Sequence, residues 1–179
     1  LGATLLWFGW FGFNAGSEFA ADGTAGLALV NTVAASGAAC LSWLVVEKLE
    51  TKHCTLTGGA TGLVAGLVVI TPAAGFVEPW AAVVMGIIVS PICYLAISKA
   101  KAKFGYDDAL DAFGCHCVGG ITGGVLDRLW RPLLHGRPQP SGQPDSRYPR
   151  HDRLRCRRQP GHRPRREGGL RRPARERRG

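Results

Sequence analysis

His116 is an ionisable side chain inside an uncharged, glycine-rich stretch, Ala112–Leu126, and three carboxylates come just before it: Asp107, Asp108 and Asp111. If this stretch lies in a membrane, an ionisable group there is costly to bury and is by default part of a path for an ion, proton or polar solute. A desolvated imidazole stays neutral, so it can donate one hydrogen bond and accept another. These residue types therefore favour transfer chemistry in an apolar conduit.

The carboxylates also have a purely structural interpretation. Asp108 and Asp111 form a D-x-x-D pattern at the start of the helix expected to carry His116. There they can accept hydrogen bonds from the unpaired N–H groups of the first turn and face the positive end of the helix dipole. We expect the three acids to act mainly as caps of this helix.

Cys115 and Cys117 flank His116 and raise the question of a metal site. Adjacent residues of a helix point about 100° apart, so these three side chains cannot converge on one ion. The other cysteines form no C-x-x-C pair. We predict neither a metal site nor another cofactor.

Five uncharged apolar stretches dominate residues 1–126 and indicate a membrane protein. A helix needs about 20 residues to cross the hydrocarbon core. The middle three are long enough, whereas the first has 17 residues and the last has 15, ending where charged residues begin. The stretches are Leu1–Ser17, Thr24–Val46, Cys54–Val77, Pro79–Ile97 and Ala112–Leu126. The predicted fold class is all-α, a polytopic transmembrane helix bundle.

The breaks between these stretches predict an orientation. All five lysines lie in two of them, 47–53 and 98–111, while the alternate breaks at 18–23 and around Glu78 carry only acids. Under the positive-inside rule, the lysine loops face the cytoplasm. The Thr71-Pro72 and Glu78-Pro79 pairs place a turn between the third and fourth helices, because proline disfavours helical geometry in the residue before it.

Glycine rows predict close helix packing in this bundle. Gly58, Gly62 and Gly66 repeat every four residues in the third stretch, and the fifth contains the pairs Gly119/Gly123 and Gly120/Gly124. Small residues at this spacing let helix backbones approach closely, which matters because lipid supplies no hydrophobic drive between helices.

The C-terminal part of the sequence has a different composition. Residues 127–179 contain seventeen arginines, no lysine and five acids, a net charge of +12, whereas residues 1–126 have five lysines and eight acids, a net charge of −3. Such an arginine- and proline-rich composition cannot build a core. We interpret residues 125–179 as a disordered or out-of-frame tail; a genuine basic tail binding anionic lipid or nucleic acid and a divergent family member are the alternatives.

Four motifs resemble the ammonium transporter (Amt/MEP/Rh) family. They are Leu5-Leu6-Trp7-Phe8-Gly9-Trp10-Phe11-Gly12-Phe13-Asn14-Ala15-Gly16-Ser17, Ala25–Thr32, Gly62–Gly75 and Asp107-Asp108-Ala109-Leu110-Asp111-Ala112-Phe113-Gly114-Cys115-His116. The resemblance covers residues 1–124 and implies helices six to ten of an eleven-helix, trimeric fold with a hydrophobic pore in each protomer. It also implies a partial membrane domain over 1–124.

The resemblance assigns expected roles to individual residues. His116 and Phe13 would line the transport pore, Ser17 and Trp10 would bind the substrate at its outer mouth, and structural positions near the pore would be Asp108, Asp111 and Gly120. An interfacial aromatic belt remains an alternative for Phe13 and Trp10, as does a plain helix-end hydroxyl for Ser17. At Cys117 the family usually has glycine.

The expected function is transport of ammonium or ammonia by a multi-pass protein of the plasma or inner membrane, not enzymatic catalysis. The family's first pore histidine has no counterpart in the matched residues, so we expect a fragment that is inactive alone. The alternative is a non-transporting truncated subunit or a sensor-like membrane protein. Expected partners are membrane lipid, two further copies of the chain in the complete protein and a regulatory protein, but not nucleic acid.

Overall fold

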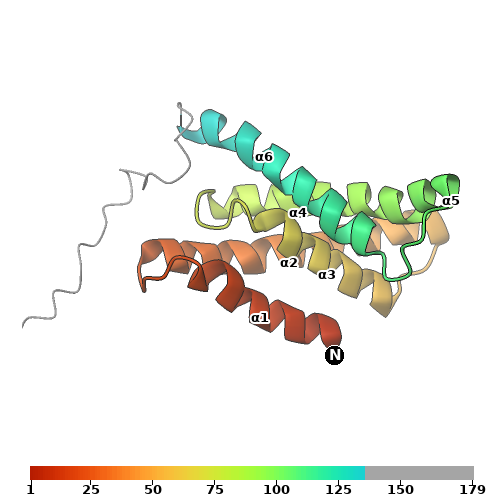
Figure 1. Ribbon diagram of the computed structural model, residues 1–179, viewed down its shortest axis with the longest axis horizontal. Helices are drawn as coiled ribbons and strands as arrows, with labels where there is room; N and C mark the ends of the chain where they lie inside the picture. The colour runs from red at the N-terminus through yellow and green to blue at the C-terminus, as the bar shows by residue number, and fades with distance from the viewer. Residues whose placement is uncertain (136–179) are drawn as a thin grey trace, which may run out of the picture.

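A computed structural model describes residues 1–135 of the chain and the side chains of residues 1–130. Every regular element in this part is helical, which confirms the all-α prediction: α1 (Gly2–Gly16), α2 (Gly23–Thr51), α3 (Leu56–Ile70), α4 (Pro79–Leu95), the π-helical turn η1 (Ala96–Ala100), α5 (Lys101–Phe104), the π-helical turn η2 (Phe113–Cys117) and α6 (Val118–His135). The long helices alternate in direction, so that successive connections lie at opposite ends of the bundle (Figure 1).

Local signals in the sequence start and stop these helices. The Asp22 carboxylate accepts hydrogen bonds from the backbone N–H groups of Thr24 and Ala25 at the start of α2. Likewise, the Thr55 hydroxyl accepts one from the Gly58 N–H at the start of α3. Pro79 occupies the first turn of α4, where its missing N–H has no cost. The turn predicted from Thr71-Pro72 and Glu78-Pro79 is confirmed, because α3 ends at Ile70 and α4 begins at Pro79.

Within residues 1–135, two helical segments are long and apolar enough to cross a membrane: α2, with 29 residues, and the 26-residue run from Pro79 to Phe104. The Cys54–Val77 stretch is long enough to span as an apolar run, but only part of it is helical. Its helix, α3, has only 15 residues, which rise about 22 Å against a hydrocarbon core about 30 Å thick. The remaining residues, 71–77, form a turn.

Asn31 of α2 stabilises this turn from the side. Its side chain is fully buried, and Nδ2 donates to the carbonyl oxygens of Ala74 at 2.8 Å and Val77 at 2.7 Å. Carbonyl groups outside a helix are costly in an apolar environment unless they receive a hydrogen bond. Through these two bonds, the chain can leave the helix at Ile70 and reverse direction beside α2.

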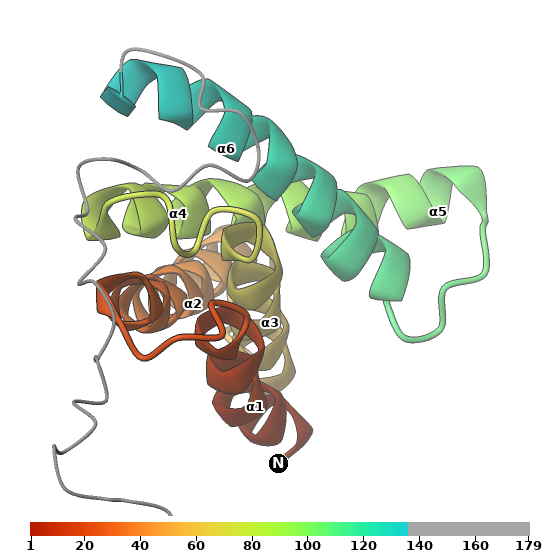
Figure 2. The ribbon, with the colours of Figure 1, turned by 60° about the vertical axis from the view of Figure 1, so that its left-hand side comes forward.

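The core lies where α2 packs between α3 and α4 (Figure 2). The predicted glycine row of the third helix is confirmed here: a Cβ at Gly66 would lie 2.6 Å from both the Ala35 carbonyl oxygen and Ser36 Cα, and one at Gly62 would collide with Trp43. In α6, by contrast, only Gly123 of the four predicted residues needs this closeness, because its Cβ would collide with the Val69 backbone.

The last helix is longer than its uncharged stretch. The prediction of disorder from residue 125 is wrong as far as His135, because α6 continues through Asp127 and Arg128. Leu126 and Trp130, one turn apart, pack against the core, and the Trp130 ring lies 5.5 Å from that of Trp80. Residues 136–179, which make up most of the expected tail, lie outside the described residues.

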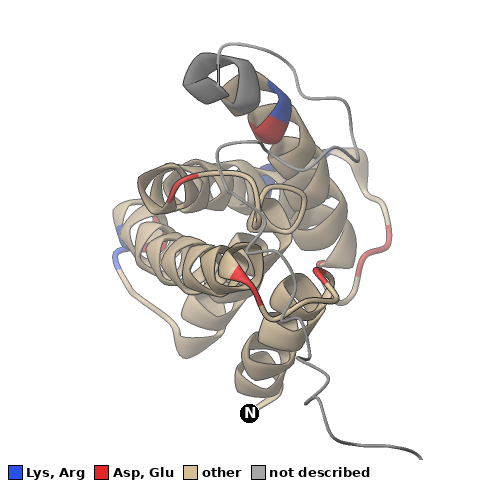
Figure 3. Ribbon diagram, turned by 90° about the vertical axis from the view of Figure 1, so that its left-hand side faces the viewer, with Lys and Arg blue, Asp and Glu red and all other residues tan. Residues whose placement is uncertain are grey.

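The two lysine-bearing loops lie at the same end of the bundle. Lys99 lies in η1, and its Nζ is 3.2 Å from Oε1 of Glu50, near the end of α2. Charged residues lie chiefly at helix ends and in loops, whereas the helix bodies are mostly uncharged (Figure 3). The arrangement agrees with the alternating topology on which the predicted orientation depends.

Candidate functional site

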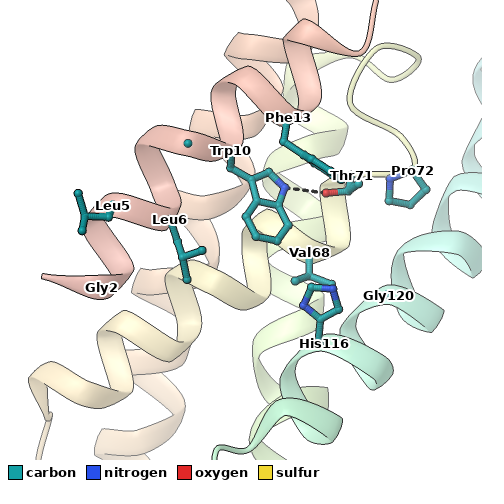
Figure 4. A pocket seen from close by; sticks show the side chains of 11 residues that line it. Gly2, Leu5, Leu6, Trp10, Phe13, Val68, Thr71, Pro72, His116 and Gly120 are labelled. Atoms are coloured by element: carbon teal, nitrogen blue, oxygen red, sulfur yellow. Dashed lines mark hydrogen bonds between the residues drawn. The ribbon is translucent and has the colours of Figure 1, made fainter.

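A cavity of about 920 Å³ opens between α1, α3 and the segment formed by η2 and α6 (Figure 4). Its wall is almost entirely apolar, and aromatic and imidazole rings project into it from different elements. The lining residues are Gly2, Leu5, Leu6, Gly9, Trp10, Phe13, Val68, Thr71, Pro72, His116 and Gly120. A largely apolar cavity with a few polar groups is the usual form of a small-molecule site.

Trp10 is the central side chain of this cavity. Its indole Nε1 donates to Thr71 Oγ1 at 2.9 Å, and Thr71 Oγ1 donates in turn to the Leu67 carbonyl at 2.8 Å. The indole ring lies 6.1 Å from the imidazole of His116 and 5.5 Å from the ring of Phe13, between centroids. Three helical elements, α1, α3 and η2, thus bring the hydrogen-bonded indole of Trp10 and the imidazole of His116 to the same wall (Figure 4).

His116 reaches the cavity from a π-helical turn, η2, rather than from an α-helix. Such turns are rare and occur often at functional sites. Gly120, four residues further on, lines the same wall, because residues four apart share a helix face. A Cβ at Gly120 would meet only Val68 Cγ1, at 3.8 Å, so glycine keeps this part of the wall free of bulk.

Phe13 and Ser17 have different positions relative to the cavity. Phe13 lines it with a ring that is 59% exposed. The Ser17 hydroxyl, at the C-terminal cap of α1, donates to the carbonyl of Phe13, and Ser17 is not among the lining residues. The structure therefore brings Trp10, Phe13, His116 and Gly120 together but leaves Ser17 beside them, on the helix end.

Of the three aspartates before His116, Asp108 and Asp111 differ from each other in role. Asp108 is a cap, as predicted: Oδ1 accepts from the Ala112 N–H at 2.9 Å and Oδ2 from the Phe113 N–H at 3.0 Å. The prediction that Asp111 also caps the helix is wrong. Asp111 adopts a left-handed backbone conformation, with φ of 53°, and its carboxylate pairs with Lys101 Nζ at 2.7 Å.

Several cavity residues have no counterpart among the predicted site residues. Thr71 was recognised only as part of a turn, and its hydroxyl fixes Trp10. The remaining ones are apolar or glycine: Gly2, Leu5, Leu6, Gly9, Val68 and Pro72. A signal for Leu6 and Gly9 exists in the sequence, because they lie four residues before Trp10 and Phe13, respectively, and so share their helix faces.

The two cysteines next to His116 differ in solvent exposure. The Cys115 side chain is buried with Sγ 3.8 Å from the Thr61 carbonyl oxygen, whereas Cys117 is exposed. In the part of the chain that the structure describes, no group of three His, Cys, Asp or Glu side chains could hold a metal ion.

Comparison with known proteins identifies the family. The family model described as "Ammonium Transporter Family" matches residues 1–131. The chain belongs to the ammonium transporter family. A curated ammonium transporter of Bacillus subtilis is 50% identical over 130 residues, a match that covers 73% of this chain and 32% of that protein. The family match extends past the boundary expected at residue 124 and into the second half of α6.

Solved structures show that the fold is that of this family of membrane transporters, which confirms the predicted transmembrane bundle. The crystal structure of Saccharomyces cerevisiae Mep2 aligns with a TM-score of 0.68 and 41% identity, over 70% of this chain and 28% of Mep2. A structure titled "Sensor Amt Protein" aligns with a TM-score of 0.66 and 35% identity, over 68% of this chain and 30% of that one. The chain spans about a third of the length of the relatives it matches.

Proposed function

We propose that this ammonium transporter family member moves ammonium or ammonia across a cell membrane through an apolar conduit, and that the cavity between α1, α3 and α6 is part of its wall. The observation that carries the proposal is the indole of Trp10 beside the imidazole of His116 in an otherwise apolar cavity. The family match and the transporter named in Bacillus subtilis support the substrate.

The chemistry of the cavity suits this cargo. An ammonium ion loses its hydration when it enters apolar surroundings, at a high cost in free energy. The faces of aromatic rings such as Phe13 and Trp10 offset part of that cost by cation–π attraction. In the same wall, the imidazole of His116 offers its ring nitrogens for hydrogen bonds to a small polar solute. The wall therefore combines cation-attracting rings with a hydrogen-bonding group.

The described residues supply only one side of such a conduit. Because the chain spans about a third of its relatives, the opposite side would come from the rest of a complete transporter. We propose that the complete protein is a transporter rather than an enzyme and that residues 1–135 do not transport alone. The complete protein would be a multi-pass homotrimer of the cell membrane, with the lysine loops on the cytoplasmic side. It would also be subject to a regulatory protein. Ser17, at the end of α1, would belong to the outer recruitment site.

A chimaera tests the transport proposal. Residues 1–135 would replace the matching segment of the Bacillus subtilis transporter, in a bacterial host that lacks its own ammonium transporters, and uptake of radiolabelled methylammonium would be measured. We expect uptake by the chimaera, loss of uptake on His116→Gln, and normal uptake on His53→Gln, which changes an exposed loop histidine outside the cavity. A chimaera that inserts normally but takes up no methylammonium would overturn the proposal.

Ammonium sensing is a second candidate, supported by the likeness to the structure titled "Sensor Amt Protein". A sensor needs the recruitment chemistry of Phe13 and Trp10 but not a through-going conduit. The two functions separate in the same chimaera, because a sensor would bind methylammonium in a calorimetric titration without accumulating it in vesicles. Binding together with accumulation would favour transport.

A further inference from the structure

The π-helical turn that carries His116 lies between two close helix contacts. At its start, Gly114 packs so closely on Ile97 of η1 that a Cβ would collide with Cγ1 of Ile97. Beyond it, Gly123 of α6 packs on the Val69 backbone. A π turn contains one residue more than an α turn, and one residue corresponds to about 100° of rotation. The extra residue lets both contacts coexist with His116 facing the cavity.

Hydrogen bonds outside the helix hold the start of this turn. The Asp108 carboxylate accepts from the backbone N–H groups of Ala112, Phe113 and Gly114, at 2.9 to 3.4 Å. Asp111, in a left-handed conformation, then accepts the Cys115 N–H on its carbonyl oxygen at 2.9 Å. The geometry of the turn therefore depends on where the loop holds these two aspartates.

Lys101 joins both aspartates to the preceding helix. Its Nζ donates to Asp111 Oδ1 at 2.7 Å and to the Asp108 carbonyl oxygen at 2.6 Å. The Lys101 and Asp111 side chains are 31% and 38% exposed, whereas those of the other pair in this region, Lys99 and Glu50, are 61% and 47% exposed. The Lys101–Asp111 pair is thus less exposed to solvent than the Lys99–Glu50 pair, and Lys101 has two hydrogen-bond acceptors.

We propose that Lys101 is a positioning residue for His116: by holding Asp108 and Asp111, it maintains the π turn that directs the imidazole toward Trp10. Without this link, the loop no longer fixes the start of the turn, which then relaxes toward α-helical geometry. His116 rotates away from the indole, although Lys101 touches neither ring. The inference concerns the position of His116 and rests on the proposed function only for its consequence in transport.

The proposal predicts that the ring-current shift of the His116 resonance by Trp10 depends on Lys101. An indole 6.1 Å from an imidazole shifts the imidazole resonances by its ring current. The full chain would be labelled at histidine only, and the His116 side-chain resonance would be assigned by its loss in His116→Gln. We expect Trp10→Phe to move this resonance in the wild-type chain, and to move it far less in a chain that carries Lys101→Met.

Matched variants separate positioning from general damage. Lys101→Arg, which keeps a charged donor, should restore the effect of Trp10→Phe, and Lys99→Met, which breaks the Lys99–Glu50 pair, should leave it unchanged. If Lys101→Met loses its helical circular dichroism, Asp111→Asn is measured instead. We expect Trp10→Phe to move the His116 resonance far less in that variant as well. The proposal is overturned if Trp10→Phe moves the His116 resonance equally with and without the Lys101–Asp111 pair, or if Lys101→Arg folds but fails to restore the effect. Transport is not needed for this measurement, so its failure is distinct from failure of the proposed function.

Discussion

Gly66→Ala should destabilise the bundle by driving α3 away from α2. The added Cβ would lie 2.6 Å from the Ala35 carbonyl oxygen and from Ser36 Cα, which are backbone atoms of two fully buried residues of α2. Heavy atoms in ordinary contact are about 3.5 Å or more apart, so the helices must separate by about 1 Å. Overpacking of this kind costs typically 1 to 3 kcal/mol. We therefore expect a clear fall in the unfolding midpoint.

The chain offers graded controls for this substitution. The Cβ of Gly59→Ala would meet the flexible end of Leu44, at 3.4 Å, and Cys40 Sγ, at 3.7 Å. Gly37→Ala, on the exposed face of α2, meets no atom within 4 Å. Thermal unfolding in detergent, followed by circular dichroism, should rank Gly66→Ala lowest, with Gly59→Ala closer to wild type and Gly37→Ala equal to it or slightly above. Equal midpoints for all three would refute the close-packing explanation.

The same displacement should reach the cavity, because α3 also carries Val68 and leads directly into Thr71. A shift of about 1 Å is enough to stretch the 2.9 Å bond between Trp10 Nε1 and Thr71 Oγ1 beyond hydrogen-bonding distance. The emission of Trp10, taken as the difference between the Trp10→Phe spectrum and its parent, should then change in Gly66→Ala but not in Gly37→Ala. Unchanged emission would show that the two sites are mechanically independent.

Three further predictions concern single side chains. Thr71→Val should free the indole of Trp10 and lower uptake by the chimaera, while Thr71→Ser should keep both the bond and the uptake; equal uptake by the two variants would contradict the role of the hydroxyl. Asp108→Ala removes the acceptor of the first N–H groups at the start of η2 and should cost about 1 to 2 kcal/mol, visible as faster hydrogen exchange at Ala112 and Phe113. Glu47→Ala removes a buried carboxylate that accepts hydrogen bonds from both the N–H and the hydroxyl of Thr55, and should lower the free energy of unfolding by about 1 to 3 kcal/mol. Glu50→Ala breaks only the exposed pair with Lys99 and should lower it by about 1 kcal/mol or less. Similar losses for the two variants would refute the role of burial.

The helix boundaries that short-range chemistry determines could be predicted from the sequence. Pro72 and Pro79 restrict their own neighbours, so the turn between α3 and α4 is encoded locally and was found. The glycine row of α3 was also predictable, because residues four apart share a face whatever the partner helix is. The same argument overestimated the row in α6, since Gly124 has open space around it and only the partner backbone decides which glycine is needed.

The errors at the C-terminal end have a simple physical cause. The length of an uninterrupted apolar stretch predicts a helix that ends at Asp127 and Arg128. The helix continues because Leu126 and Trp130 lie one turn apart and still reach the core, while Arg128 faces outward. Helical periodicity, rather than unbroken hydrophobicity, was the informative signal there.

The polar details of the site could be predicted only in part. The capping role of Asp108 follows from its place before a helix, but Asp111 pairs with a lysine ten residues earlier, which depends on the path of the loop. Neither π-helical turn has a signal in the sequence. The bond between Trp10 and Thr71 joins residues 61 positions apart, and single-sequence reasoning has no means to pair them.

Asn31 restricts which amino acids its position can accept. Two carbonyl oxygens, of Ala74 and Val77, each receive one of the two N–H bonds of a single side-chain nitrogen. A hydroxyl has one hydrogen to give and a carboxylate has none, while glutamine is one methylene longer in a site with no exposed surface. A hydroxyl or carboxylate at position 31 would therefore leave at least one of these carbonyls unpaired, and glutamine would force the turn to open. Variation in related chains should accordingly accumulate on the outer face of α2 and avoid this one amide.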